Sequence, residues 1–284
     1  MSIYIIGKNG YIAKKLVSKL SKNNHVILTS STSLTDCETL DLLHPERFPF
    51  EKIGVDDTIV FLAALSSPDA CDKNYEHAYN INVRGTRFFI QNSLNSGARV
   101  LFFSSDTVYG NKEFAVNEDS DCDPLGNYGR MKYEVERQFL SDPLFKVFRL
   151  SYVFSKEDKF TGYLTGCSSK QDQADVFHPF NRSVVYIEDV VEAISRLIET
   201  WEEWDNAIFN ICGPQTISRV DMAQLYQQKV DPGLKFRVTT PDEHFFRARP
   251  QTITMRSNYM ERLIARKQVT ISDAMQIEFQ EENK

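Results

Sequence analysis

Long apolar segments and runs of like charge are missing from this sequence. No apolar run approaches the roughly 20 residues that a membrane-spanning helix needs. The chain carries 33 basic and 39 acidic residues, a formal net charge of −6, with no long block of either sign. This balance argues against a surface built for nucleic acid or anionic lipid. We therefore expect small molecules or proteins as partners, with no nucleic acid and no membrane.

Paired cysteines and metal-ligand patterns are also missing. The five cysteines are scattered, without a Cys-x-x-Cys pair, which is typical of reduced thiols in a cytosol. The five histidines do not stand at metal-ligand spacing to each other or to a cysteine, so we expect no metal. The chain begins with an apolar strand pattern rather than a cleavable leader, which predicts a soluble cytoplasmic protein.

What the sequence does contain is a regular alternation of apolar strand patterns and amphipathic helix patterns. It predicts strands at 2–6, 25–30, 58–64, 99–105, 146–152 and 207–212, and helices near 11–20, 78–96, 128–140, 188–200 and 218–229. Such alternation predicts an α/β fold of the Rossmann type, a doubly wound parallel sheet with helices on both faces.

Two regions depart from this alternation and predict a smaller lobe. Residues 155–182 are polar and rich in Ser, Gln and Asp, and we expect an excursion rather than core there; the tail from about 230 adds a small mixed segment. We expect residues 1–154, with 183–213 returning to them, to form a dinucleotide-binding Rossmann domain. Residues 155–182 and 214–284 would form a small C-terminal substrate-binding lobe packed against it.

A glycine turn directly after the first strand predicts a phosphate site. In GKNGYIA, at 7–13, Gly7 permits the tight bend, Gly10 lets the backbone approach a pyrophosphate, and Ala13 allows close packing of helix on strand. The helix that follows offers free N–H groups and the positive end of its dipole. The alternative is a turn that uses glycine only for its geometry.

The end of the second strand bears on the choice of dinucleotide. A site that prefers NAD usually carries an acidic side chain there for the ribose 2′-hydroxyl, whereas this chain has Thr29-Ser30-Ser31. Hydroxyls can donate to a 2′-phosphate without repelling it, and Lys8 is near enough in the sequence to help. We expect NADP(H), with NAD(H) as the alternative.

A tyrosine and a lysine four residues apart occur four times in the chain. The pairs are Tyr4/Lys8, Tyr11/Lys15, Tyr128/Lys132 and Tyr152/Lys156. Only Tyr128/Lys132 combines helical spacing, which places both side chains on one face, with a strand end rich in hydroxyls upstream, FSSDTVYG at 103–110. A lysine cation nearby favours the phenolate and lowers the pKa of tyrosine, which makes Tyr128 usable as a proton donor or acceptor near pH 7.

Together these motifs resemble the extended short-chain dehydrogenase/reductase family of nucleotide-sugar epimerases, dehydratases and reductases. The family's order is kept by GKNGYIA, FLAA, NVRGT (82–86), SSDTVYG (104–110), YGRMK (128–132), RLSYVF (149–154), RSVVYIEDVVEAI (182–194), FNICGP (209–214) and RPQTITMRS (249–257). Within the family, GKNGYIAKKL and RLSYVF are most similar to the dTDP-4-dehydrorhamnose reductases, which reduce a 4-keto nucleotide sugar.

The resemblance implies a role for each candidate residue. Ser105 would orient the substrate oxygen, Tyr128 would be the acid/base, and Lys132 would bond the nicotinamide ribose and tune the tyrosine. The cofactor would contact Gly7, Asn9, Gly10, Tyr11, Ile12, Ser30, Asp41, Leu42, Ala63, Ala64, Asn82, Tyr128 and Lys132. The substrate would contact Asp106, Thr107, Tyr152 and Arg182.

The resemblance leaves three functions open. The first is an NAD(P)-dependent reductase of a nucleotide-linked keto-sugar of the 4-keto-6-deoxy type, with Tyr128 as proton donor. The second is a nucleotide-sugar 4-epimerase with tightly bound NAD, and the third a non-enzymatic cofactor-binding regulatory subunit. Ser105-Asp106-Thr107 lacks the glutamate that 4,6-dehydratases place there, which disfavours dehydration. Family members often dimerise through helices corresponding to 80–96 and 128–140, so a homodimer is expected.

Overall fold

The centre of the molecule is a seven-stranded sheet. The computed structural model describes residues 1–22, 24–32 and 37–280. The strand order is β11-β6-β5-β4-β1-β2-β3, and every pairing in the sheet is parallel. The strands are β1 (Ser2–Ile6), β2 (His25–Ser30), β3 (Glu38–Thr39), β4 (Thr58–Phe61), β5 (Arg99–Ser105), β6 (Phe145–Leu150) and β11 (Ile208–Ile211). The predicted doubly wound α/β fold is confirmed.

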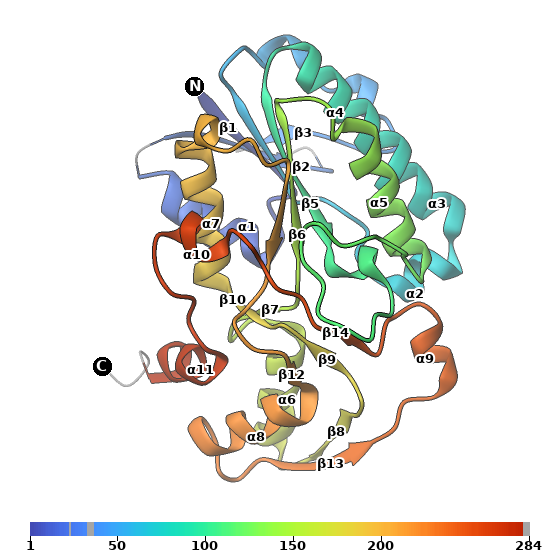
Figure 1. The fold of residues 1–284 in the computed structure, drawn as a ribbon, viewed down its shortest axis with the longest axis vertical. Coiled ribbons are helices and arrows are strands. Elements are labelled where there is room, and N and C mark those ends of the chain that lie inside the picture. Colours follow the sequence, from blue (N-terminus) through green and yellow to red (C-terminus); the bar gives the residue numbers. More distant parts are fainter. Residues whose placement is uncertain (23, 33–36, 281–284) are drawn as a thin grey trace.

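Helices cover both faces of the sheet (Figure 1). One face carries α1 (Tyr11–Leu20) and α7 (Ile187–Glu199), and the other carries α3 (Tyr75–Tyr79), α4 (Thr86–Asn95) and α5 (Asn127–Phe139). Successive side chains of a strand point to opposite faces. In β5, Leu101 and Phe103 accordingly pack in the cluster with α1 and α7, whereas Val100 and Phe102 pack in the cluster with α4 and α5.

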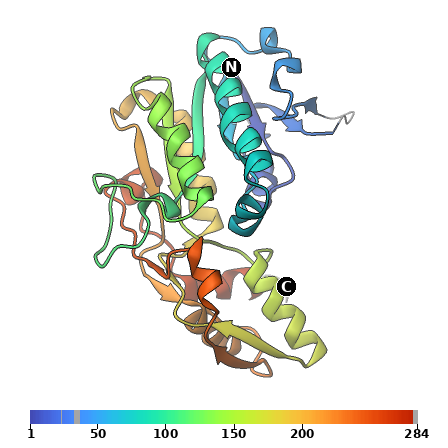
Figure 2. The ribbon, with the colours of Figure 1, turned by 90° about the vertical axis from the view of Figure 1, so that its right-hand side faces the viewer.

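A smaller lobe lies below the carboxyl ends of the strands (Figures 1 and 2). It contains the parallel pair β8 (Gln173–Phe177) and β13 (Lys235–Thr239), and a three-stranded sheet of β9 (Asn181–Arg182), β12 (Ile217–Ser218) and β14 (Thr252–Ile253). Its helices are α6 (Lys159–Lys170), α8 (Arg219–Lys229), α9 (Glu243–Arg247) and α11 (Ile271–Gln280). We propose that this lobe and the large sheet are the two domains whose boundaries the sequence predicts.

Three predicted elements differ from the structure. Strand β4 ends at Phe61 rather than at 64, and the predicted strand at 146–152 stops at Leu150 and resumes as β7 (Val153–Phe154), which pairs with β10 (Val185–Tyr186). The predicted helix at 78–96 consists of α3, a π-helical segment at 80–85 and α4. These breaks matter, because residues 62–64 and 151–152 are thereby free to line a cleft.

The prediction that 155–182 lies outside the core is wrong, because Leu164, Ala174 and Val176 belong to the large hydrophobic cluster. Asp158 caps α6 by accepting hydrogen bonds from the N–H groups of Phe160 at 2.8 Å and Thr161 at 3.0 Å. Ala174 and Val176 of β8 are fully buried. The many polar residues of this region lie on the outer sides of a helix and a strand, which masked the short buried pattern between them.

Candidate active site

A cleft with a volume of about 920 Å³ runs along the carboxyl ends of the parallel strands. Ligands bind at this edge in open α/β sheets. Of the predicted site residues, the cleft is lined by Gly7, Asn9, Gly10, Tyr11, Ile12, Ser30, Asp41, Leu42, Ala63, Ala64, Ser105, Asp106, Thr107, Tyr128, Lys132, Tyr152 and Arg182. The fold thus brings together residues from widely separated segments of the chain.

The glycine turn forms one end of this cleft. Gly7 has φ of +96°, and a Cβ atom there would lie 3.0 Å from the Cα of Ala63. Gly10 precedes α1, and within the described part of the chain no side chain caps that helix. Because the turn presents bare backbone and a helix N-terminus to the cleft, it fits a pyrophosphate.

Hydroxyl groups and one carboxylate surround the neighbouring end of β2. The Ser30 hydroxyl lies 3.2 Å from that of Thr32, and the Asp41 carboxylate accepts a hydrogen bond from the N–H of Leu43 at 2.9 Å. Lys8 and Ser31 line the same part of the cleft. This wall can accommodate either a ribose hydroxyl or a phosphate.

Asn82 is the predicted cofactor residue that is not among the residues lining the cleft. Its Oδ1 accepts a hydrogen bond from the Leu65 N–H at 2.8 Å, and its Nδ2 donates to the Leu65 carbonyl at 3.0 Å. Leu65 lines the cleft, whereas Asn82 stands behind it. Asn82 thus fixes the cleft wall through Leu65, and its contact with the cofactor stays a prediction.

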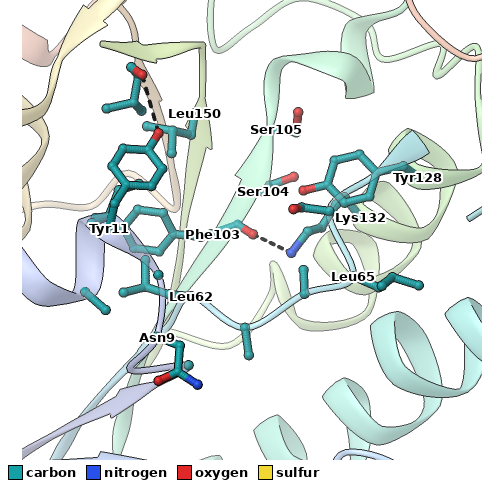
Figure 3. Close-up of a pocket in the computed structure, with 18 of the residues that line it drawn as sticks. Asn9, Tyr11, Leu62, Leu65, Phe103, Ser104, Ser105, Tyr128, Lys132 and Leu150 are labelled. Carbon is teal, nitrogen blue, oxygen red and sulfur yellow. Dashed lines mark hydrogen bonds between the residues drawn. The ribbon is translucent and has the colours of Figure 1, made fainter. Parts of the chain in front are cut away.

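Tyr128 and Lys132 project from α5 into the cleft opposite the end of β5 (Figure 3). The Lys132 ammonium donates a hydrogen bond to the Phe103 carbonyl at 2.7 Å and lies 4.6 Å from the centroid of the Phe102 ring. It lies 6.0 Å from the centroid of the Tyr128 ring. Their helical spacing places both groups on one face, as the sequence predicted.

The electrostatics of this pair differ from the prediction. Burial raises the pKa of Tyr128, and nearby Cys71 and Asp106 add to the rise. Burial lowers the pKa of Lys132 to about 7, against the opposing effect of Glu136 and Cys71. The expectation that Lys132 lowers the pKa of Tyr128 is wrong for this structure: desolvation is the largest cause of the shift, and Lys132 is not among the groups that change this pKa. Near neutral pH the Tyr128 phenol is protonated and can donate a proton.

The Ser105 hydroxyl is engaged at the start of the 3₁₀ turn at 106–109. It donates to Asp106 Oδ1 at 3.1 Å and accepts from the Thr107 N–H at 3.2 Å and the Thr107 hydroxyl at 3.0 Å. Asp106 is buried, which raises its pKa, and it forms an ion pair with Arg182 at 3.4 Å that opposes the rise. Asp106 and Arg182, which are both predicted to contact the substrate, therefore form an ion pair with each other.

Arg182 and Tyr152 also direct polar groups into the protein. Arg182 donates to the carbonyls of Asn181 at 2.6 Å and Pro250 at 2.8 Å. The Tyr152 hydroxyl donates to Asp158, and the Arg219 guanidinium carbon lies 3.9 Å from the Tyr152 ring centroid. Both residues line the cleft, Tyr152 chiefly as a fixed aromatic surface.

Sequence reasoning missed several residues at the substrate end of the cleft. Phe180, Arg249, Asp158 and Lys159 line it. Arg249 forms a bidentate ion pair with Asp69, with both N–O distances at 2.6 Å. A signal for Arg249 exists, since it opens the RPQTITMRS motif, but no local pattern places that motif beside the cleft.

Within the described residues, no group of three or more His, Cys, Asp or Glu side chains could hold a metal ion. In the same part of the chain, no helix is both long and apolar enough to span a membrane.

A doubly wound parallel sheet with a glycine turn and a Tyr-x-x-x-Lys pair at the carboxyl ends of its strands defines the extended short-chain dehydrogenase/reductase class. The model of the RmlD substrate binding domain family matches residues 1–278. The chain belongs to this family, and with it to the nucleotide-sugar reductases and epimerases of that class, as the motifs predicted.

Individual relatives agree with this placement. The chain is 24% identical over 228 residues to a dTDP-4-dehydrorhamnose reductase of Aggregatibacter actinomycetemcomitans, covering 78% of this chain and 76% of the relative. A UDP-glucuronic acid 4-epimerase from Bacillus cereus, solved with NAD and a fluorinated UDP-glucuronic acid, superposes with a TM-score of 0.83 at 18% identity, covering 99% and 98% of the chains. A dTDP-4-dehydrorhamnose reductase from Clostridium acetobutylicum superposes with a TM-score of 0.80 at 21% identity, covering both chains completely. At these identities the superpositions show the fold.

Proposed function

We propose that the protein is an NAD(P)-dependent reductase of a nucleotide-linked keto-sugar of the 4-keto-6-deoxy type. One observation carries this proposal. Tyr128, Lys132 and Ser105 line the same cleft as the glycine turn at Gly7–Ala13. A proton donor and a dinucleotide-binding turn facing one cavity are what reduction of a carbonyl requires.

A nicotinamide bound beside the glycine turn would supply hydride to the keto carbon. Tyr128 donates its phenolic proton to the keto oxygen, and its raised pKa keeps that proton in place at neutral pH until the oxygen gains charge. Lys132, anchored on the Phe103 carbonyl, provides further N–H donors close to the tyrosine. Ser105 and Thr107 offer hydroxyls at the end of β5 to hold the substrate oxygen.

The reductase is preferred over the 4-epimerase because the RmlD substrate binding domain model matches residues 1–278 and the chain is similar to a dTDP-4-dehydrorhamnose reductase. The complete Ser105/Tyr128/Lys132 set speaks against a non-enzymatic regulatory subunit.

We further propose that the cofactor is NADPH, with NADH as the alternative. Ser30, Ser31 and Lys8 line the cleft beyond the glycine turn, where an acidic side chain would repel a 2′-phosphate. Asp41, which also lines this region, is the group that could serve an unphosphorylated ribose. The homodimer and the cytoplasmic location stay predictions.

The function is tested by following NADPH and NADH oxidation with 4-keto sugars linked to dTDP, UDP and GDP. We expect cofactor oxidation with at least one of these substrates. A 4-epimerase would instead release stoichiometric NAD on acid treatment of the purified protein and turn over without added cofactor, which would contradict the reductase.

A further inference from the structure

Ser104 contributes a buried hydroxyl to the wall of the cleft. The residue is 4% exposed and lines the cleft directly before Ser105. Among the described residues its Oγ has no hydrogen-bond partner. Buried hydroxyls in folded proteins are nearly always hydrogen-bonded, so a group of this kind beside a reacting centre calls for a partner that acts during the reaction.

The direction of the Ser104 side chain follows from the strand. Residues two apart in a strand share a face, so Ser104 lies on the same face of β5 as Phe102, over whose ring the Lys132 ammonium sits. Helix α5 runs antiparallel to β5, since Phe139 at its far end packs on Phe145, a neighbour of the first residues of β5.

Going back one helical turn from Lys132 to Tyr128 therefore means moving toward the carboxyl end of β5. The residue of β5 that lies next in this direction after Phe102, on the same face, is Ser104. Figure 3 shows the Ser104 side chain directed from β5 toward Tyr128 and Lys132. The two serine hydroxyls at the end of β5 therefore have different surroundings. The Ser105 hydroxyl is hydrogen-bonded to Asp106 and Thr107, whereas the Ser104 side chain faces Tyr128 and Lys132.

We infer that Ser104 is a further positioning residue of the reaction, whose hydroxyl accepts a hydrogen bond from the Lys132 ammonium and donates one to the Tyr128 phenolic oxygen. Lysine has three N–H donors, and the Phe103 carbonyl takes one of them. Catalytic hydrogen bonds of this kind tighten when substrate is bound. This inference rests on the reductase proposed above.

The proton balance of the step is complete. Hydride adds to the keto carbon, and the proton of the Tyr128 O–H passes to the keto oxygen, so that the C=O group becomes CH–OH and Tyr128 a phenolate. The Ser104 proton then moves to the phenolate oxygen, and a Lys132 proton moves to Ser104. Neutral Lys132 recovers its proton from solvent.

The kinetic test compares Ser104→Ala and Ser104→Thr with the wild-type enzyme. The alanine variant should lower kcat by roughly 10- to 100-fold, a part of what positioned proton transfer contributes, while the KM for substrate changes little. The threonine variant keeps a hydroxyl and should recover most of the loss. The matched control is Ser195→Ala on α7, whose buried hydroxyl donates to the Val191 carbonyl and should leave kcat unchanged.

A second measurement does not depend on activity. The pKa of Lys132 is followed by NMR of ¹³C-methylated lysines, with its signal identified by its absence in Lys132→Gln. Wild-type Lys132 should titrate near the value of about 7 that burial gives it. In the cofactor-bound protein, where we propose that this hydrogen bond forms, Ser104→Ala should lower the pKa of Lys132 further, because the charged form loses an acceptor. If the alanine variant does not fold, Ser104→Cys, which keeps only a weak donor, replaces it in both measurements.

The outcomes separate this inference from the proposed function. An unchanged Lys132 pKa together with unchanged kcat in the Ser104 variants would overturn the inference while leaving the reductase intact. A lowered Lys132 pKa in a protein that reduces no keto-sugar would support the hydrogen bond and overturn the proposed function.

Discussion

The two ends of the cleft differ in whether backbone or side chains line them. The cofactor end is lined mainly by backbone: the bend at Gly7, the start of α1, which no side chain of the described residues caps, and the main chain after β4. The substrate end is lined by side chains that interact with each other, in the ion pairs Asp106–Arg182 and Asp69–Arg249 and the hydrogen bond between Tyr152 and Asp158. The comparison teaches that the cofactor end depends on close approach of the backbone, whereas the substrate end depends on paired side chains, of which Asp106–Arg182 is a buried ion pair.

At the substrate end, removing one charge of a buried ion pair should have the largest effect on stability. Arg182→Leu leaves Asp106 without its cation, and we expect a loss of about 3–5 kcal/mol in the free energy of unfolding, as for other broken buried pairs. Chemical denaturation measures it.

This loss should also depend on pH. Asp106 already has a raised pKa from burial, and without Arg182 that pKa rises further. The folded state then binds more protons than the unfolded state, so the variant should become less stable as pH rises through the unfolded pKa of an aspartate. An unfolding free energy of Arg182→Leu that did not fall with rising pH would show that the pair is not the stabilising element.

At the cofactor end, a substitution that disturbs the backbone geometry of the glycine turn should weaken cofactor binding. Gly7→Ala forces a side chain into φ of +96° and against Ala63, and strain of this kind costs about 1–3 kcal/mol. We expect weaker binding of NADPH by at least about tenfold in a fluorescence titration. The control is Gly162→Ala in α6, where a Cβ would meet no atom of the described residues within 4 Å. Equal effects of the two substitutions would refute the role of the turn.

Lys132 lies where the two ends meet, and its burial predicts a pH-dependent contribution to stability. The folded pKa of about 7 lies below the usual value of 10.5, so between these values the unfolded state binds more protons. Lys132→Met should therefore be more stable than wild type below pH 7, and the advantage should shrink as pH rises from 7 toward 10.5. Thermal unfolding of both proteins across this range, without cofactor, tests the sign.

The smallest expected effect concerns the choice of cofactor. Ser31→Asp places a carboxylate where the 2′-phosphate of NADPH is proposed to lie, and we expect the preference to move toward NADH by about tenfold, about 1.4 kcal/mol. The ratio of kcat/KM for the two cofactors measures this. Ser169→Asp, on the exposed side of α6, serves as the control and should leave the ratio unchanged.

The same comparison explains how much of the molecule can be predicted from its sequence. The parallel sheet and the glycine turn are encoded locally, as apolar strands and as small residues at fixed spacing, so the places of Gly7, Tyr128 and Lys132 follow from sequence patterns alone. The pairs Asp69–Arg249 and Asp106–Arg182 join residues far apart in the chain, and no local pattern reports such contacts. The raised pKa of Tyr128 has no local signal either, because burial is set by the whole fold.

The central claim is that Tyr128 protonates a keto-sugar oxygen while hydride reaches the carbon beside it. The most direct test follows deuterium from NADPH deuterated at the transferring position of the nicotinamide into the sugar product, in wild type and in Tyr128→Phe. The account predicts one deuterium at the former carbonyl carbon with wild type, and a loss of rate of roughly 100-fold or more in the variant with cofactor affinity retained. Product without deuterium, or a Tyr128→Phe variant with near wild-type turnover, would contradict it.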